Sequence, residues 1–384
     1  MKTDNIANVR EAGAVGNGVA DDTDAFQKAF FSGHANTFIP AGNYRISKTL
    51  RVPSRTHVVA DAAARIFHCG DTPKKRGDFL LTNSDHGKGN EDITIEGGIW
   101  DGNNTGKFNT KDPDLFNENA WSGTMLNFFN VRRLRLENMH LWNSVVYYTR
   151  FSKISDFVIR RIAFYSKEFG FNQDGLHFGG EVRDGLIEDI RAENGQTNDD
   201  LLALNADDTV VRLENRDLLC GPIENLTFKN IYAENCYTAI RFLSINSPIR
   251  NIHIENINVG CRHFAINLDA ARYCRTPLLR EEDFPEGAGC IENVEIDGMT
   301  AFASGSQSER ALIDCETRVR NFRIHNFLRD MGKDADRSLP TFIAQNVKFL
   351  KIRAAGTDGD FLANLNDKKD SCRIDVPFST LELN

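Results

Sequence analysis

From residue 131 onward, apolar and polar residues alternate in short blocks that share one pattern. Each block opens with an apolar residue and usually a polar one, then a variable position, and then alternating apolar positions. Alternation with a period of two is typical of a β-strand with one buried face. The eight copies are VRRLRLENMHLW from Val131, ISDFVIRRIAF from Ile154, VRDGLIEDIRAEN from Val182, IENLTFKNIYAEN from Ile223, IRNIHIENINV from Ile249, IENVEIDGMTA from Ile291, VRNFRIHNF from Val319 and VKFLKIRAAG from Val347. One kind of strand is therefore used many times.

The spacing of the copies predicts a solenoid. They recur at about 23 to 28 residues, apart from two longer steps of about 41. The frame of leucine-rich repeats is absent and no long helical pattern follows residue 130, so each turn is expected to consist of short strands. We predict an all-β chain that forms a right-handed parallel β-helix from 131 to about 365, with loops at about 206–221 and 270–289. A degenerate earlier copy, EDITIEGGIWDGN, surrounds Ile93.

The N-terminal region predicts a cap. DDTDAFQKAFFSG fits a short helix with Asp21 or Asp22 as its N-cap, two phenylalanines and an alanine on one face, and Gly33 after its end. The stretch NTFIPAGNYRIS that follows reads as strand, turn and strand. An amphipathic helix laid across the first coil would cover an otherwise adhesive sheet edge.

These elements fit a single domain, residues 1–384. The N-terminal cap takes up about residues 1–60. Residues 102–130 are polar and rich in asparagine, which predicts an insert before the regular coils. A loop of that length in a compact fold is usually a functional wall or lid.

Composition narrows the possible partners and compartments. A net charge of −8 and a pI near 5.7 argue against nucleic acid or an anionic membrane as a partner. No run of about 18 apolar residues predicts a membrane span, and the first residues lack the apolar stretch of a secretory signal. We expect a cytoplasmic protein if this N-terminus is native, and a secreted one if a signal has been removed. Eight cysteines without a Cys-x-x-Cys pair predict buried, reduced thiols rather than a metal or redox motif.

Two acidic turns interrupt the apolar repeat, FNQDG at 171–175 and TNDD at 197–200. Alone, each would be an ordinary turn, because Asp and Asn bond their own backbone. Neighbouring coils lie about 4.8 Å apart, however, so residues at similar distances from the start of their repeats are expected on one face. The polar residues that lie 17 to 20 positions after the first residue of their repeat are Arg150, Asp174, Asp199, Asp200, Arg241, Asn267 and Asp269.

The stacking predicts a cluster of three carboxylates. Asp199 has Asp174 on the preceding coil and Asp200 next in sequence, and repulsion is expected to raise its pKa toward that of a usable acid. His177, in the strand LHF, is expected to point outward into the same cleft. Asp207 and its neighbour Asp208 lie beyond the next strand, and replacing either of them by asparagine is expected to change the activity of this cluster little.

At this point the sequence resembles the polygalacturonase-like glycoside hydrolases of family 28, which have a right-handed parallel β-helix of the pectin lyase type. The residues that carry the resemblance are NQDG, NDD, the strand LLALNAD and AIRF in the next coil. The opening EAGAVGNGVADDTDAFQKAF also resembles the N-terminal segment of many pectin-lyase-fold enzymes and phage tailspikes. Together the resemblance covers most of residues 8–260.

The resemblance implies an inverting, metal-independent hydrolysis of a polysaccharide or oligosaccharide, with no cofactor. It implies that Asp199 is the general acid and that Asp174 with Asp200 activates water. Arg241 falls on the arginine of the family's Arg-Ile-Lys signature, but Leu243 replaces its lysine. The Gly-His-Gly signature is absent, since the segment reads RDLLCGPIEN. These departures argue against unsubstituted polygalacturonate as the substrate.

Substrate contacts are expected from the polar face and from one aromatic residue of the insert. These residues are Arg241, His177, Asn172, Arg150, Asn267, Asp269 and Trp121. Trp142 and Tyr148 are weaker candidates for stacking on a sugar, and His253 and His263 are expected to be structural.

Two other functions stay open. A lyase on the same fold would hold Ca²⁺ between the stacked aspartates and use Arg241 to remove a proton beside a uronate carboxylate. A carbohydrate-binding or tailspike-like module would use the same face without turnover. The sequence specifies neither the sugar, nor endo or exo action, nor the oligomeric state.

Overall fold

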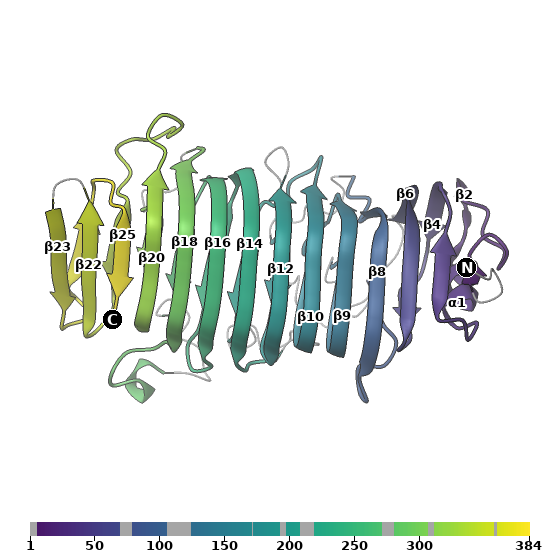
Figure 1. The fold of residues 1–384 in the computed structure, drawn as a ribbon, viewed down its shortest axis with the longest axis horizontal. Coiled ribbons are helices and arrows are strands. Elements are labelled where there is room, and N and C mark those ends of the chain that lie inside the picture. The colour runs from purple at the N-terminus through teal and green to yellow at the C-terminus, as the bar shows by residue number, and fades with distance from the viewer. Residues whose placement is uncertain are drawn as a thin grey trace.

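The chain folds as a parallel β-helix, as the repeat predicts (Figure 1). The structure, a computed structural model, describes residues 6–69, 79–105, 124–170, 172–192, 197–207, 219–270, 280–305, 311–356 and 359–384. In Figure 1 the long strands of the front sheet run upwards while the coils advance from right to left. This is the right-handed sense, which parallel crossovers adopt almost always.

Most coils pair a long strand with a short one, and each kind stacks on its counterparts in neighbouring coils. The long strands are β6 (Thr56–His68), β8 (Asn90–Asp101), β9 (Leu126–Trp142), β10 (Thr149–Tyr165), β12 (Val182–Ala192), β14 (Ile223–Cys236), β16 (Ile249–Cys261), β18 (Ile291–Ala303) and β20 (Val319–Arg329). The short strands are β5 (Leu50–Val52), β7 (Leu81–Asn83), β11 (Leu176–Phe178), β13 (Asp200–Asn205), β15 (Thr238–Leu243), β17 (Ile266–Asp269), β19 (Ile313–Cys315) and β21 (Phe342–Gln345). The short strands and the first residues of β9 and β10 form what we call the site sheet.

Each long strand from β8 to β20 bends at two residues that take a left-handed backbone, five positions apart, and β8, β9 and β10 have a third such residue. In β14 and β16 these are Asn225, Asn230, Asn251 and Asn256, with φ between 56° and 58°. Asparagine tolerates this conformation, which is unfavourable for most L-residues. Asn251 Nδ2 also donates to Asn225 Oδ1 at 3.0 Å, and Asn256 Nδ2 donates to Asn230 Oδ1 at 2.6 Å. The same side chains thus form the corners and link the coils.

The strand register confirms seven of the eight repeat copies. Successive partners along the stack are Val131, Ile154, Val182, Ile223, Ile249, Ile291 and Val319. The degenerate copy around Ile93 pairs with the copy that follows it. Since β9 begins at Leu126, the end of the expected insert, residues 126–130, is strand.

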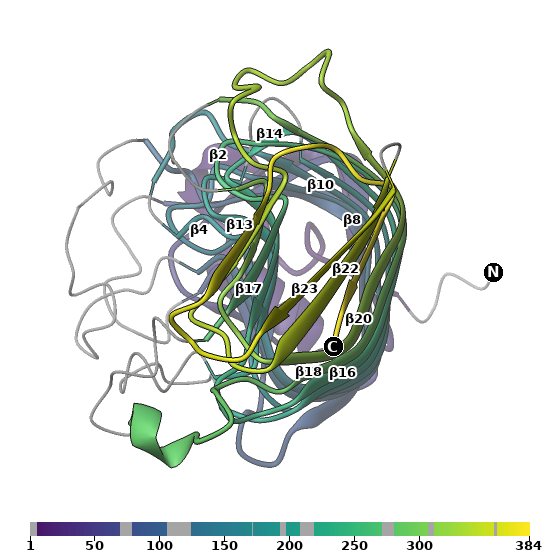
Figure 2. The same cartoon turned by 90° about the vertical axis from the view of Figure 1, so that its left-hand side faces the viewer.

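The eighth copy does not continue the parallel coil, so the prediction was wrong from about residue 347 to 365. There β22 (Leu350–Gly356) runs antiparallel to β23 (Gly359–Leu365) and to β25 (Thr380–Leu383), which lies beside β20. In the same way β24 (Ser371–Ile374) pairs antiparallel with β21. Figure 2 shows these strands lying across the C-terminal end of the coil. A further parallel strand would leave an open edge ready to pair with another chain, and the reversal covers β20.

The N-terminal end is capped as expected. The elements are β1 (Ile6–Asn8), β2 (Asn17–Asp21), α1 (Thr23–Phe30), β3 (Asn36–Ile39) and β4 (Gly42–Ile46). Asp21 accepts a hydrogen bond from the Thr23 amide at 3.1 Å, Phe26 and Phe30 are buried, and Gly33 follows with φ +84°. Within the described ranges, α1 and the short 3-10 helix η3 (Glu281–Asp283) are the helical elements, and none is long and apolar enough to cross a bilayer.

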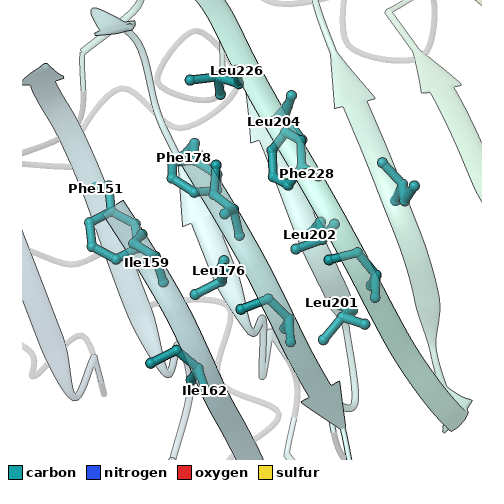
Figure 3. Close-up of a cluster of buried hydrophobic side chains, with 14 of the residues drawn as sticks. Phe151, Ile159, Ile162, Leu176, Phe178, Leu201, Leu202, Leu204, Leu226 and Phe228 are labelled. Atoms are coloured by element: carbon teal, nitrogen blue, oxygen red, sulfur yellow. The ribbon is translucent and has the colours of Figure 1, made fainter. Parts of the chain in front are cut away.

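The inside of the coil is filled by stacked apolar side chains (Figure 3). Phe151 and Phe178 occupy equivalent positions on neighbouring coils, with ring centroids 5.2 Å apart, and Phe178 meets the edge of Phe228 at 6.2 Å. Residues that point inward from the site sheet therefore belong to the core, and their neighbours along the strand point to the other side.

The corner geometry predicts a specific sensitivity at Asn256. Asn256→Val should lower the free energy of unfolding by about 1–2 kcal/mol for the left-handed backbone and about 1 kcal/mol for the lost hydrogen bond. Asn256→Gly should lose mainly the hydrogen bond. Urea denaturation would measure both, with Asn258→Val as the control, because Asn258 is an exposed strand position where a β-branched residue fits. Equal losses for the two valine variants would contradict the role of the corner.

Candidate functional site

The three predicted acids lie together where β11 and β13 begin. The Gly175 amide donates to the backbone carbonyl of Asp200 at 2.9 Å, which brings the two turns side by side. One carboxylate oxygen from each of Asp174, Asp199 and Asp200 lies within 4.8 Å of the others. Asp174 and Asp200 are only 3% and 2% exposed, while Asp199 is partly exposed. The predicted cluster therefore exists, and most of it is withdrawn from solvent.

Gln173, which the sequence analysis did not single out, anchors the turn that carries Asp174. Its buried amide donates to the carbonyls of Ser144 at 2.6 Å and Glu168 at 3.1 Å, and accepts from the Gly170 amide at 2.8 Å. Asn198 in the other acidic turn donates to the Gly170 carbonyl at 2.9 Å. The only signal in the sequence was a glutamine directly before the acid, between polar turn residues.

His177 points away from the core, as expected, but it is 1% exposed rather than open to a cleft. Its Nδ1 lies 2.6 Å from Asp174 Oδ2, a hydrogen bond that the ring donates when this nitrogen carries its proton. The ring meets Tyr147 edge-on at 4.9 Å, and Arg150, also 1% exposed, lies over Tyr147 at 5.6 Å. His177 and Arg150 are therefore packed beside the acids.

The register corrects the expected column of residues. One row across the site sheet consists of Arg150, His177, Ala203, Arg241 and Asn267. Asp174 and Asp200 lie three residues before this row, and Asp269 lies two residues after it, opposite Leu243. Equal counting from the repeat start failed because the connections between long and short strands differ in length.

Arg241 lies between two carboxylates. Its Nη1 is 3.5 Å from Asp200 Oδ2 and its Nη2 is 3.1 Å from Asp269 Oδ2. Asp269 is fully buried and the side chain of Arg241 is 14% exposed. Leu243, at the position of the family lysine, is also buried. Arg241, which was expected to contact the substrate, is therefore already engaged in two ion pairs.

The remaining residues that were expected to contact substrate differ in their exposure. Asn267 is 4% exposed in the row of Arg241, and Asn172 is partly exposed in the acidic turn, with φ 55°. Trp121 lies outside the described residues. Tyr148 is wholly buried and its hydroxyl donates to the Tyr165 carbonyl at 2.9 Å, so it is a core residue rather than a sugar contact.

Asp207 has a structural role that the sequence did not predict, whereas the expectation that Asp207→Asn changes turnover little stays a prediction. It is 1% exposed, and its Oδ2 accepts hydrogen bonds from the amides of Ile245, Asn246 and Ser247 at 2.6 to 2.8 Å. The carboxylate thus holds the turn after β15, where it is structural. The neighbouring position, 208, lies outside the described residues.

Burial controls the protonation of two of the three acids. It raises the pKa of Asp200 to about 7, with the charge of Asp199 adding to the rise and Arg241 opposing it. It also raises the pKa of Asp174, against the hydrogen bond from His177. The predicted rise at Asp199 stays a prediction. Three carboxylates with different surroundings can divide acid and base roles, and their oxygens are also the ligand type of Ca²⁺ and Mg²⁺.

Comparison with known proteins relates most of this chain to a family. Residues 6–262 match the family described as rhamnogalacturonase A/epimerase, pectate lyase-like. A pre-neck appendage protein of Bacillus phage B103 is 35% identical over 97 residues, covering 25% of this chain and 11% of that protein. A probable polygalacturonase of Arabidopsis thaliana is 24% identical over 257 residues, covering 60% of this chain and 52% of that protein. The chain thus spans about a tenth of the phage relative and about half of the plant relative.

A solved structure gives the same fold. The family 28 exopolygalacturonase of Yersinia enterocolitica is 15% identical, with a TM-score of 0.51, and the match covers 86% of this chain and 67% of that one. At this level of identity the likeness establishes the β-helix alone.

The raised pKa of Asp200 predicts a pH-dependent stability. The folded protein holds this proton up to about pH 7, and the unfolded chain only up to about 3.8. Between these values the folded state binds more protons, so stability falls as the pH rises. Asp200→Asn should therefore gain in unfolding free energy relative to the wild type from pH 4 to pH 8. Denaturation across this range would measure it, with the exposed Glu295→Gln as control; parallel curves for wild type and Asp200→Asn would contradict the assignment.

Proposed function

This chain belongs to the rhamnogalacturonase A/epimerase, pectate lyase-like family, and from that premise we propose that it is a glycoside hydrolase acting on a pectin-related or similar polysaccharide or oligosaccharide. The observation that carries the proposal is the cluster of three carboxylates, of which two are buried, at one edge of the site sheet. Burying like charges together costs folding free energy. Proteins commonly keep such an arrangement where it serves catalysis. Hydrolysis of a glycosidic bond commonly needs a protonated and an ionised carboxyl that flank this bond.

The roles follow the resemblance to the family 28 hydrolases rather than the order of the pKa values, since the charge of Asp199 is itself one cause of the raised pKa of Asp200. Asp199, the partly exposed member, delivers a proton to the leaving oxygen. Asp174 and Asp200 hold and activate the water, and His177 and Arg241 fix their orientation. A general base works best with a pKa near the operating pH, which fits the value of about 7 for Asp200. Turnover should therefore rise as the pH passes through that value and Asp200 ionises.

Inversion is part of the proposal, although the spacing is short for it. Inverting enzymes usually hold their carboxyls about 6.5–9.5 Å apart and retaining enzymes about 5–5.5 Å. Here the nearest oxygens lie within 4.8 Å. Asp174 is held through its Oδ2 by His177, and Asp200 faces Arg241, so both carboxylates have fixed orientations. Two held carboxylates are better suited to share a water.

A binding module without turnover is the second candidate. It is favoured by the phage appendage relative, which matches 25% of this chain at 35% identity, and by the low exposure of Asp174 and Asp200. Both candidates bind carbohydrate, so catalysis itself has to be measured. A panel of pectic, rhamnogalacturonan and galactan oligosaccharides is the appropriate set of substrates.

Removing the general acid should abolish turnover while the fold stays intact. Asp199→Asn should lower the rate at least about a hundredfold, the usual scale of general acid catalysis. Asp174→Asn and Asp200→Asn should also cripple hydrolysis, because the water loses its base. Asp156→Asn is the matched control, since Asp156 is a corner residue with φ 56° where asparagine fits. Near-wild-type turnover by Asp199→Asn would favour the binding module.

The products should distinguish hydrolysis from elimination. We expect NMR of fresh products to show the inverted anomer, without the ultraviolet absorbance of unsaturated uronates. Activity should survive EDTA, because the proposed roles need no cation. Loss of activity in EDTA that Ca²⁺ restores, together with unsaturated products, would instead identify a lyase, and a retained anomer would refute the shared water.

A further inference from the structure

Two aromatic rings continue the line of Asp199 along the coil axis. The Thr238 amide donates to the backbone carbonyl of Asp199 at 3.5 Å, so Tyr237 lies level with Asp199 on the next coil. The His263 amide donates to the carbonyl of Tyr237 at 2.8 Å, which places His263 level with both on the coil after that. The rings of Tyr237 and His263 stack, with centroids 4.6 Å apart and planes 6° apart.

An arginine is wedged between these rings and a third aromatic residue. Arg262 Cζ lies 5.8 Å from the ring centroid of Tyr237 and 5.6 Å from that of Phe169. Its Nε and Nη2 are buried and make no hydrogen bond with the residues that the structure describes. A cation held against ring faces in this way fixes the rings. Arg262 therefore supports Tyr237 and Phe169, in contrast to Arg241, which bonds to carboxylates.

The cluster is accessible on its outer side. Phe169 is 45% exposed, although it lies in the segment that leads to the acidic turn, and Tyr237 and His263 are partly exposed. We call Phe169, Tyr237, Arg262 and His263 the aromatic platform. An exposed phenylalanine beside stacked, partly exposed rings is costly in water, and such surfaces commonly serve binding.

We propose that the aromatic platform is a sugar-binding subsite directly beside Asp199, and that it takes a pyranose ring through its C–H face. Aromatic faces carry negative charge density, which attracts the positively polarised C–H groups of a sugar. That the subsite lies beside the cleaved glycosidic bond rests on the proposed function, whereas sugar binding by the platform does not.

Binding should be measured without turnover, by calorimetry on the Asp199→Asn variant with the same oligosaccharide panel. Adding Phe169→Ala or Tyr237→Ala should weaken the best ligand by up to about tenfold, the scale of one aromatic contact. Adding Tyr237→Phe, which keeps the ring, should restore most of the affinity. Circular dichroism of each variant would verify that the coil is intact.

The matched control is Tyr232→Ala. Tyr232 is also a partly exposed tyrosine of β14 with an arginine over its ring, Arg191 at 5.0 Å, but it lies on a different face. Tyr232→Ala should therefore leave the affinity for the oligosaccharide unchanged. The proposal is overturned if no oligosaccharide of the panel binds, or if Tyr232→Ala weakens binding as much as Tyr237→Ala does. Binding that depends on Tyr237 in a wild type that cleaves none of the panel would uphold the platform and refute the hydrolase.

Discussion

The left-handed backbone at two positions of each regular coil is the constraint on which the rest of this structure depends. A coil must change direction within its long strand, and few residues can do so without strain. Asparagine meets this need and also bonds to the coil beside it, as Asn251 and Asn256 do with Asn225 and Asn230. Because corners stack on corners, the strands that leave them are held in one register. That register decides which side chains of the site sheet become neighbours.

In the site built on this register, carboxylates are paired with side chains from a neighbouring row of the site sheet. His177 is bonded to Asp174, and Arg241 lies between Asp200 and Asp269. Asp174, Asp200 and Asp269 are thus each held by one basic side chain, and burial, together with the charge of Asp199, raises the pKa of Asp200 to about 7. The scaffold tolerates the cost because the stacked apolar core and the corners, rather than the acids, hold the coils together.

Much of the fold could be predicted because its period is visible in the sequence, and so could the existence of the acid cluster. Which residues lie side by side in a row of the site sheet could not be predicted. One residue separates β14 from β15 whereas seven separate β12 from β13, and counting from the start of each repeat cannot correct for this difference. The burial of His177 and the anchoring role of Asp207 depend on partners that sequence spacing does not reveal. The copy at Val347 has the same alternation as the others, and its antiparallel pairing with β23 and β25 sets it apart.

The fixed interval between corners also limits how a lineage of such chains can change in length. One residue gained or lost between two corners would turn every following side chain of that strand to the opposite face. A duplicated coil, in contrast, preserves every interval, and so does an insertion beyond the corners, such as those that precede β14 and β18. Natural selection can therefore remodel the rim of the site by whole coils and by loops, while point deletions within the long strands are removed.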